Sequence, residues 1–394
     1  MRILLVSEPG ENGVFRHVED LAEHLIRAGH VVSLAYSDVR GSDRLFALLA
    51  RVRSAGGLTV NLRVGNEPQV GDLRALGRLW RLYRRFRPDV VHAHSAKAGG
   101  LVRMLRRLHP RHRVLYTPHA YYGMGRPMSA SVRFFTAVER FLAPRTMTIN
   151  LSQDEAEYGS RVLRLDPAWQ RLIPNGVDTS HFRPCAAAEK EALRARFGIP
   201  AGAVVLGSLG RFSYQKDPGS LHKAFRACAD LMPNLFLVHG GAGELRSEVQ
   251  HYARTHGYEH RVHWIEYLRD PAPFYRMLDC FILTSRYEGL SFAALEALSS
   301  NLPLILSDAP GNRGFSSIGL SHLWNARVEY PASFASAITS WYDDQVRPRP
   351  CNHHDVAVSS FSRSRQFADI EAAYFEMCGT QRNRQERRAQ AVHS

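Results

Sequence analysis

Short apolar runs alternate with amphipathic helical stretches along most of this sequence. Residues 2–6 (RILLV) predict a buried strand, and residues 10–30 predict a glycine turn and a helix that ends at Gly29. Further strands are predicted within VVSLAY, DVVHAH, RVLYTPHA and TMTINLS, with a helical stretch between each strand and the next. Strands and helices in this order form a parallel sheet that is covered on both faces.

The alternation starts again after residue 184, with strands predicted within AVVLGSLGRF, LFLVHGG, VHWIEY, CFILTS and PLILSD. A chain of 394 residues is also too long for one ordinary core. We therefore predict an α/β protein of two doubly wound, Rossmann-like domains at residues 1–180 and 185–350. A turn-rich linker is expected at residues 174–184.

Two further elements are expected near the end of the sequence. A helix is predicted at residues 361–378, where apolar residues recur at helical spacing, and it can pack back on the N-terminal domain. Residues 380–394 are polar and basic, which predicts a disordered tail.

The composition is that of a globular protein, with 45% hydrophobic and 22% charged residues. The first apolar run is too short for a signal peptide, and no stretch approaches the roughly 18 apolar residues of a membrane span. We therefore expect a cytoplasmic protein. The five cysteines form no C-x-x-C pair, which argues against a disulfide framework and against a zinc site built on cysteine.

Positive charge is concentrated in one region. The chain carries 51 lysines and arginines against 37 acidic residues, and twelve of these cations lie between Arg74 and Arg113 with a single acid, Asp89. Two helices predicted there place arginines opposite an apolar face, and acids for i, i+4 pairing are missing. Charge of this kind fits nucleic acid or an anionic membrane.

Ligands of open parallel sheets bind beyond the carboxyl ends of the strands, where helix N-termini offer amides to phosphate. With two such domains facing each other, the expected site is the cleft between them. A dinucleotide-dependent dehydrogenase is disfavoured, because the first turn carries only Gly10 and Gly13 and lacks a G-x-G-x-x-G pattern.

The second domain contains a better phosphate site. Arg211 and Lys216 follow its first strand, in GSLGRFSYQKDP, and can converge on a diphosphate. After the strand CFILTS, the turn at Glu288 and Gly289 leads into a helix that begins near Ser291.

That helix brings two kinds of polar group to one place. The amides of Leu290 and Ser291 are expected to point at the ligand, and a helix N-terminus favours phosphate. Glu296 lies farther along the helix among apolar residues, where a buried carboxylate needs partners.

These motifs resemble those of retaining glycosyltransferases of the GT-B fold, in the large group (family 4) that includes bacterial polysaccharide and lipopolysaccharide hexosyltransferases. The resemblance rests on the E-x(7)-E element EGLSFAALE, together with GRFSYQKDP and IPNGVDTSHF, and extends over residues 2–377. It implies that Glu296 binds the ribose of a nucleotide sugar and that Glu288 contacts the transferred sugar. It further implies that Arg211 and Lys216 neutralise the diphosphate.

The resemblance also implies roles for the first domain, which is expected to supply the acceptor site. His119, in the T-P-H of YTPHAYYG, is expected to hydrogen-bond the donor sugar. A lone histidine is otherwise more often structural, but the end of a strand favours a functional role. Gly10 and Gly13 resemble the glycine loop beside the donor phosphates, and Lys97, in HAHSAKAGG, is a candidate contact to acceptor or phosphate.

No metal and no other cofactor is expected, because no Asp-x-Asp element is present to hold a divalent ion on the diphosphate. The donor is expected to be a UDP-sugar, with a GDP-sugar as the next candidate. Two glutamates also suggest a glycosidase-like pair. The resemblance instead implies front-face attack, in which a donor phosphate oxygen takes the acceptor's proton while the protein positions the reactants. Removal of Arg211 or Lys216 is then expected mainly to lower kcat. The chain departs from the family's pattern at Gly314, where an acid is common.

The sequence therefore predicts a retaining, metal-independent transfer of a hexose or N-acetylhexosamine to a lipid-linked glycan acceptor in cell-surface polysaccharide synthesis. The Arg74–Arg113 region is expected to hold the enzyme peripherally at the anionic inner face of the plasma membrane. Nucleic acid is disfavoured as a partner, because no nucleic-acid-binding module is recognised. Two alternatives stay open: a sugar-nucleotide 2-epimerase of similar architecture, which would not be expected to carry the E-x(7)-E element, and a non-catalytic nucleotide-sugar-binding protein.

Overall fold

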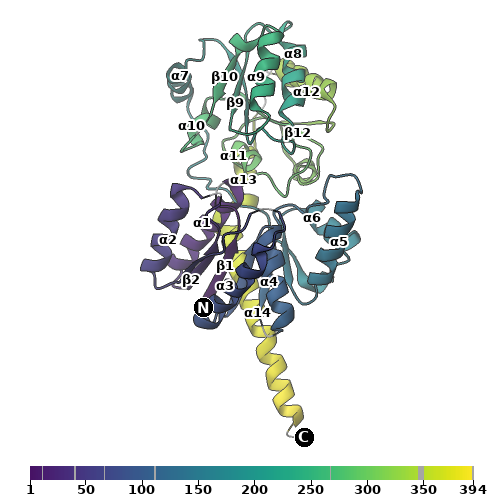
Figure 1. Ribbon diagram of the computed structural model, residues 1–394. Helices are drawn as coiled ribbons and strands as arrows, with labels where there is room; N and C mark the ends of the chain where they lie inside the picture. The colour runs from purple at the N-terminus through teal and green to yellow at the C-terminus, as the bar shows by residue number, and fades with distance from the viewer. Residues whose placement is uncertain are drawn as a thin grey trace. The chain divides into compact units, whose positions relative to one another are not determined.

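The chain divides into two compact units in the computed structural model (Figure 1). Unit 1 comprises Met1–Pro174 and Gln366–Ser394, and unit 2 comprises Asn175–Arg365. The structure describes residues 1–10, 12–39, 41–65, 67–110, 112–266, 268–344 and 350–392; of residue 12 and of residues 380–392 it describes only the backbone.

Unit 1 contains a seven-stranded parallel sheet. Its strands are β1 (Arg2–Ser7), β2 (Val31–Tyr36), β3 (Thr59–Asn61), β4 (Val90–His94), β5 (Val114–Thr117), β6 (Met147–Asn150) and β7 (Gln170–Leu172). They lie in the order β3-β2-β1-β4-β5-β6-β7, so the direction of winding reverses between β1 and β4. The short edge strands β3 and β7 were not predicted, because three residues give no readable alternation.

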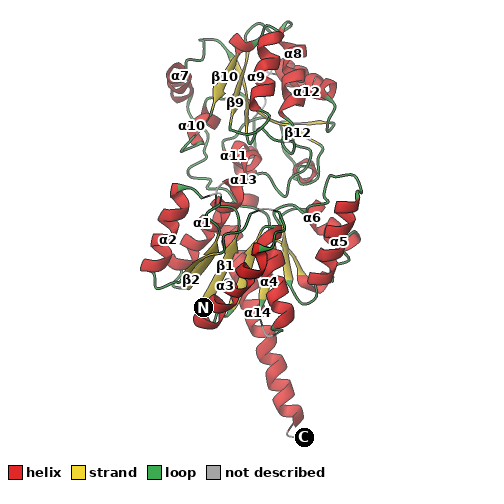
Figure 2. Ribbon diagram, in the orientation of Figure 1, coloured by secondary structure: helices red, strands yellow, loops and turns green. Residues whose placement is uncertain are grey.

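The helices of unit 1 cover both faces of its sheet (Figure 2). They are α1 (Asn12–Arg27), α2 (Asp43–Ser54), α3 (Gly71–Phe86), α4 (Ala96–Leu108), α5 (Ala130–Leu142), α6 (Gln153–Arg161) and α14 (Arg363–Val392). On β1, Ile3 and Leu5 enter the core beneath α1, α2 and α14, whereas Leu4 and Val6 enter the core beneath α3 and α4. This alternation follows from the two-residue period of a strand.

Helix α14 returns the end of the chain to unit 1, as the sequence allowed. Its apolar stripe, which includes Phe367, Ile370 and Tyr374, is buried in the core with α1 and α2. The backbone is helical to Val392, where we expected a disordered tail over residues 380–394. Gln, Arg, Glu and Ala all favour a helix and give the physical reason for the difference. Residues 393–394 and the side chains of the tail lie outside the described residues.

Unit 2 contains a six-stranded parallel sheet in the order β10-β9-β8-β11-β12-β13. Its strands are β8 (Val204–Leu209), β9 (Leu235–Gly240), β10 (Val262–Ile265), β11 (Cys280–Leu283), β12 (Leu304–Ser307) and β13 (Leu323–Ala326). Its helices include α7 (Ala187–Arg196), α8 (Pro218–Ala229), α9 (Arg246–Thr255), α10 (Ala272–Arg276), α11 (Phe292–Ser299), α12 (Pro331–Asp344) and α13 (His353–Phe361). One core packs α8 and α12 on the sheet.

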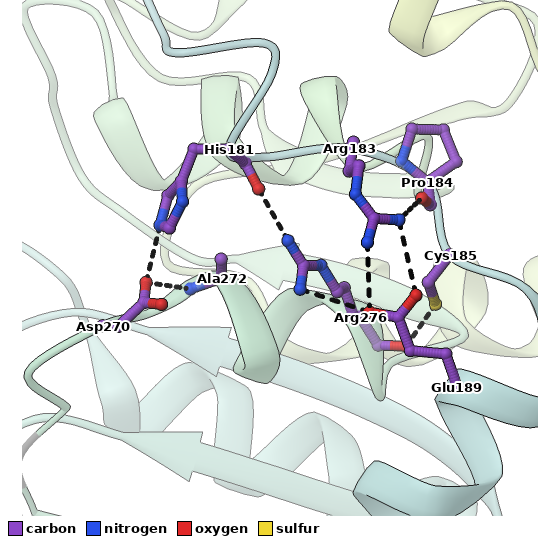
Figure 3. A network of polar contacts seen from close by, with 8 residues as sticks. All are labelled: His181, Arg183, Pro184, Cys185, Glu189, Asp270, Ala272 and Arg276. Carbon is purple, nitrogen blue, oxygen red and sulfur yellow. Dashed lines mark hydrogen bonds and ion pairs between the residues drawn. The ribbon is translucent and has the colours of Figure 1, made fainter.

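The predicted linker at residues 174–184 is mostly part of unit 2. Nε2 of His181 lies 2.7 Å from a carboxylate oxygen of Asp270, and Arg276 donates to the His181 carbonyl at 2.8 Å (Figure 3). Arg276 also pairs with Glu189 at 3.2 Å. These bonds tie the segment to α7 and α10, so the boundary at residues 174–175 precedes the predicted one.

Within the part of the chain that is described, no helix combines the length and the hydrophobicity needed to cross a lipid bilayer.

Candidate functional site

In unit 2 the loops after β8 and β11 meet where the strand order reverses. β8 pairs with β9 on one side and with β11 on the other, an arrangement that opens a ligand site beyond the carboxyl ends of these strands. The amide of Arg286 donates to the Gln215 carbonyl at 2.8 Å, and the Gln215 side chain donates to the Tyr287 carbonyl at 3.1 Å. The two loops are therefore fixed to each other.

Lys216 and Glu288, one from each loop, form an ion pair. Nζ of Lys216 donates to Oε1 of Glu288 at 2.5 Å, and the Ser285 hydroxyl donates to the same oxygen at 2.6 Å. Glu288 is buried, with 6% of its surface exposed. A carboxylate offers about four acceptor sites, so Oε2 retains the capacity to accept from a sugar hydroxyl. The sequence predicted both residues but not their contact.

The turn at Gly289 leads into α11 as expected. The Ser291 hydroxyl caps the helix by accepting from the Ala294 amide at 3.4 Å, and the Leu290 carbonyl accepts from Asn175 at 2.9 Å. Among the described residues, the backbone N–H groups of Leu290 and Ser291 donate to no protein acceptor. Both amides can therefore serve an anion.

Two other predicted residues of unit 2 differ in exposure. Glu296 lies in the second turn of α11 and is only 4% exposed. Arg211 is exposed, and its guanidinium lies 3.4 Å from the Gln215 side-chain oxygen. Among the described residues the Arg211 guanidinium makes no other hydrogen bond or ion pair, so it can turn toward a ligand without breaking one.

The first glycine turn and Lys97 lie in unit 1. Gly10 forms a bridge with Gly41, and Gly13 lies in the first turn of α1. Nζ of Lys97 is 2.7 Å from Asp72 and 2.5 Å from the Glu67 carbonyl, and its side chain is 6% exposed. Lys97 is thus paired with Asp72 within unit 1, and its contact with acceptor or phosphate stays a prediction.

His119 follows β5 in a constrained loop. Its φ is 56° and that of Ala120 is 90°, and residues with side chains seldom adopt such values. The Ala120 amide donates to Glu155 at 2.6 Å, as does the Leu151 amide, also at 2.6 Å. Burial raises the pKa of Glu155 to about 7, although these two N–H groups oppose the shift. The carboxyl group thus holds the loop that carries His119.

The sequence missed the partners of His119. His94 ends β4 and His17 lies on α1, and Nδ1 of His94 is 3.2 Å from Nε2 of His119. Burial lowers the pKa of both His94 and His119 well below the usual value, and that of His17 to about 4. The sequence does contain a sign of this contact, because His94 belongs to an H-A-H at the end of a predicted strand, but that stretch was interpreted only for Lys97.

The basic Arg74–Arg113 region divides into buried and exposed parts. Arg103 makes a bidentate pair with Glu139, at 2.7 and 3.0 Å, and Arg106 donates to the Pro144 carbonyl at 2.9 Å. Both are buried, so the prediction that they face the same partner as the other arginines is wrong. Arg111 lies outside the described residues. The exposed arginines of α3 are Arg74, Arg81, Arg84 and Arg85.

Models of two protein families match the chain: Glycosyltransferase Family 4 over residues 11–181 and Glycosyl transferases group 1 over residues 189–355. A GDP-mannose-dependent alpha-mannosyltransferase of Mycobacterium tuberculosis is 31% identical over 330 residues, which cover 79% of this chain and 80% of that relative. The UDP-Gal:alpha-D-GlcNAc-diphosphoundecaprenol alpha-1,3-galactosyltransferase of Escherichia coli is 30% identical over 248 residues, covering 62% of this chain and 64% of the relative. The crystal structure of Anabaena HepE with UDP and glucose has the same fold, with a TM-score of 0.78 at 18% identity over 95% of this chain and 100% of that one.

Proposed function

The chain belongs to the family 4 glycosyltransferases of GT-B fold, and from this premise we propose that it moves a hexose or N-acetylhexosamine from a nucleotide sugar to a lipid-linked saccharide in cell-surface polysaccharide synthesis. The observation that carries the proposal is the Lys216–Glu288 pair beside two available amides at the switch point of unit 2. The Escherichia coli relative is named for a diphosphoundecaprenol-linked sugar, which supports the choice of acceptor.

We assign the donor to the loops of unit 2. Arg211, Lys216 and the amides of Leu290 and Ser291 receive the diphosphate, Glu288 accepts from hydroxyls of the transferred sugar, and Glu296 accepts from the ribose. A UDP-sugar is the preferred donor, since the Escherichia coli relative is named for UDP-Gal and the Anabaena structure is a complex with UDP and glucose. GDP is the next candidate, because the mycobacterial relative is named for GDP-mannose.

We assign the acceptor site to unit 1. The Gly10–Gly13 turn of this unit is assigned to contact the donor phosphates. His119 contacts the donor sugar. Because its Nε2 faces His94, this contact falls to Nδ1.

The proposed chemistry proceeds with retention and without a metal ion at the diphosphate. The acceptor hydroxyl attacks the anomeric carbon from the face of the leaving group, and its proton passes to a donor phosphate oxygen. Two cations and two amides meet the developing charge, which is the arrangement that lowers such a barrier. Glu288 is bound to Lys216 and Ser285 and is therefore assigned to sugar binding and not to nucleophilic attack.

The proposal is tested by incubating the full chain with UDP-sugars, then GDP-sugars, and a diphospholipid-linked N-acetylhexosamine, without added divalent metal. Transfer with release of the nucleoside diphosphate, and a product anomer identical to that of the donor by NMR, is the expected result. Inversion at the anomeric carbon would refute the retaining mechanism. A new sugar epimer formed without acceptor would favour the 2-epimerase, and binding without nucleotide release would favour the non-catalytic protein.

A further inference from the structure

Three histidine side chains from separate elements of unit 1 converge at the carboxyl end of its sheet. His17 comes from α1, His94 ends β4 and His119 follows β5. One ring nitrogen from each lies within 4.8 Å of the corresponding nitrogen of the other two. His17 and His94 are buried, and His119 is partly exposed. In the proposed transfer His119 contacts the donor sugar, whereas His17 and His94 have no assigned role.

The spacing fits tetrahedral metal coordination. Nδ1 of His94 and Nε2 of His119 are 3.2 Å apart. Two imidazole nitrogens bound to one zinc ion at 2.0–2.1 Å in a tetrahedron lie about 3.4 Å apart. From a separation of at most 4.8 Å, the third nitrogen needs to approach by no more than about 1.4 Å. Ring rotations of ordinary size achieve this.

The protonation of the cluster also suits a metal. Burial lowers the pKa of all three imidazoles, so each is neutral at pH 7, which is the form that binds metal ions. Nε2 of His94 is buried and has no hydrogen-bond partner among the described residues. With a metal on Nδ1 of His94, the nitrogen that lies 3.2 Å from Nε2 of His119, the ring proton is carried by Nε2, and this is the tautomer that leaves the Nδ1 lone pair for the metal.

The surroundings hold the cluster in place. The ring centroids of His92 and His94 lie 4.0 Å apart at an interplanar angle of 40°, and the two nitrogens of His92 contact the Tyr374 hydroxyl at 2.7 Å and the Thr117 hydroxyl at 2.8 Å. Glu155 fixes the Ala120 amide next to His119. Supports of this kind orient the ligands of metal sites.

We propose that His17, His94 and His119 bind one divalent transition-metal ion of the zinc class, with water or a ligand atom in the fourth position. The ion joins α1 to the loop after β5. The site lies within unit 1, no metal is invoked for the diphosphate, and the existence of the site does not depend on the proposed transfer reaction.

The test uses the full chain, stripped of metal and then dialysed against zinc, with metal content measured by mass spectrometry. We expect one zinc ion per chain and an increase of several degrees in Tm on zinc addition, because the ion binds only the folded state. His94→Gln and His17→Gln should each weaken zinc binding at least a hundredfold. His251→Gln, an exposed histidine of unit 2, is the matched control and should bind zinc like the wild type.

Cobalt(II) gives a readout that does not depend on any variant folding. A tetrahedral site of three imidazoles should produce intense visible absorption in the wild type that zinc displaces. Less than about 0.2 zinc ions per chain in the wild type would overturn the proposal, as would a weak six-coordinate cobalt spectrum. Equal zinc content in the wild type and in folded His94→Gln would also overturn it and would assign the bound metal to surface histidines.

Discussion

At the scale of single residues, the contact between Lys216 and Glu288 joins stability to function. Both side chains are largely buried, with 18% and 8% exposed. The removal of one partner from such a pair leaves an uncompensated charge, which costs more than the pair itself contributes. A diphosphate offers Lys216 a second anion, so the pair is a preformed half of the proposed donor site.

A double-mutant cycle separates these two roles. Lys216→Met should lower the free energy of unfolding of unit 2 by about 1–3 kcal/mol, because Glu288 loses its countercharge. Lys216→Met/Glu288→Gln should recover much of this loss. Transfer should stay at least tenfold below wild type in both variants, since about 1.4 kcal/mol of transition-state stabilisation is gone. Urea unfolding and initial transfer rates provide the measurements, and a double mutant with wild-type activity would contradict the assignment.

The raised pKa of Glu155 predicts how the stability of unit 1 depends on pH. Its pKa is raised from 4.5 to about 7 in the folded protein. Between these two pH values the folded state binds more protons than the unfolded state. Protonated Glu155 therefore contributes fully to the free energy of unfolding below pH 4.5, and this contribution falls by about 3 kcal/mol in all as the pH rises to about 7.

Glu155→Gln removes this titration. The difference in unfolding free energy between wild type and Glu155→Gln should therefore shrink by about 3 kcal/mol from pH 4.5 to pH 8. Hydrogen exchange of unit 1 peptides in urea series at several pH values would measure it. Parallel pH curves for the two proteins would show that burial of Glu155 has no such effect.

The sequence predicted residue types at the site better than it predicted their partners. Glu288 and Glu296 occur in EGLSFAALE and Lys216 occurs in GRFSYQKDP, and the residue spacing within each of these motifs is informative. Lys97 looked available because its partner Asp72 lies 25 residues away, on the preceding helix. Contacts between distant segments depend on side-chain geometry, which one sequence does not contain.

At the scale of elements, one glycine holds the loop after β12 against the turn at Glu288. Gly311 has φ of 87°, and an added Cβ would lie 2.2 Å from the Glu288 carbonyl oxygen. The departure that we noted in this loop, Gly314, has open space around it. Two glycines three residues apart therefore have opposite structural demands.

Gly311→Ala should destabilise unit 2 by about 2 kcal/mol or more, because the new methyl group meets backbone that cannot move without displacing Glu288. The affinity of Gly311→Ala for nucleoside diphosphates should also be lower than that of the wild type. Gly314→Ala should change stability by less than about 0.5 kcal/mol. Thermal unfolding and nucleotide titration of both variants check this, and equal effects at the two positions would contradict it.

The central strands were predicted well, whereas of the edge strands in the two described sheets only β10 was predicted, within VHWIEY. The strand at residues 31–36 was predicted to the residue, whereas β3, β7 and β13 were missed. The central strands carry continuous apolar runs because both faces are buried. The missed strands β3, β7 and β13, with three or four residues each, carry mixed sequences that resemble loops.

At the scale of the whole molecule, the last helix completes the core of unit 1. Ile370 on α14 is 1% exposed, whereas Phe375 on the same helix is 57% exposed. Ile370→Ala should lower the unfolding free energy of unit 1 by about 2–4 kcal/mol, and Phe375→Ala should change it by about 0.5 kcal/mol or less. Hydrogen exchange of β1 and α1 peptides distinguishes the two outcomes. Unchanged protection in Ile370→Ala would mean that α14 contributes little to this core.

The charge distribution predicts membrane binding through α3. A pocket of about 240 Å³ between β3 and α3 is lined by Arg78, Arg81 and Arg85 together with apolar and threonine side chains. Arg78 also donates to the Leu62 carbonyl at 2.9 Å, so Arg81 and Arg85 are the better positions for a test.

Arg81→Glu/Arg85→Glu should weaken binding to vesicles with 30% anionic lipid at least tenfold, since each basic residue near such a surface contributes about 1 kcal/mol. The matched control, Arg161→Glu/Arg196→Glu, changes the net charge equally on other surfaces and should bind like the wild type. Binding should weaken with salt. Equal loss in both double variants would mean that net charge alone, and not α3, governs the interaction.

The most direct test of the central claim is calorimetric titration of the full chain with UDP and then GDP, with and without added Mg²⁺. We expect one nucleotide per chain, an affinity that Mg²⁺ changes less than twofold, and at least tenfold weaker binding by Lys216→Met. If neither nucleotide binds, or if folded Lys216→Met binds as tightly as the wild type, the loops of unit 2 do not hold a nucleotide sugar in the way proposed.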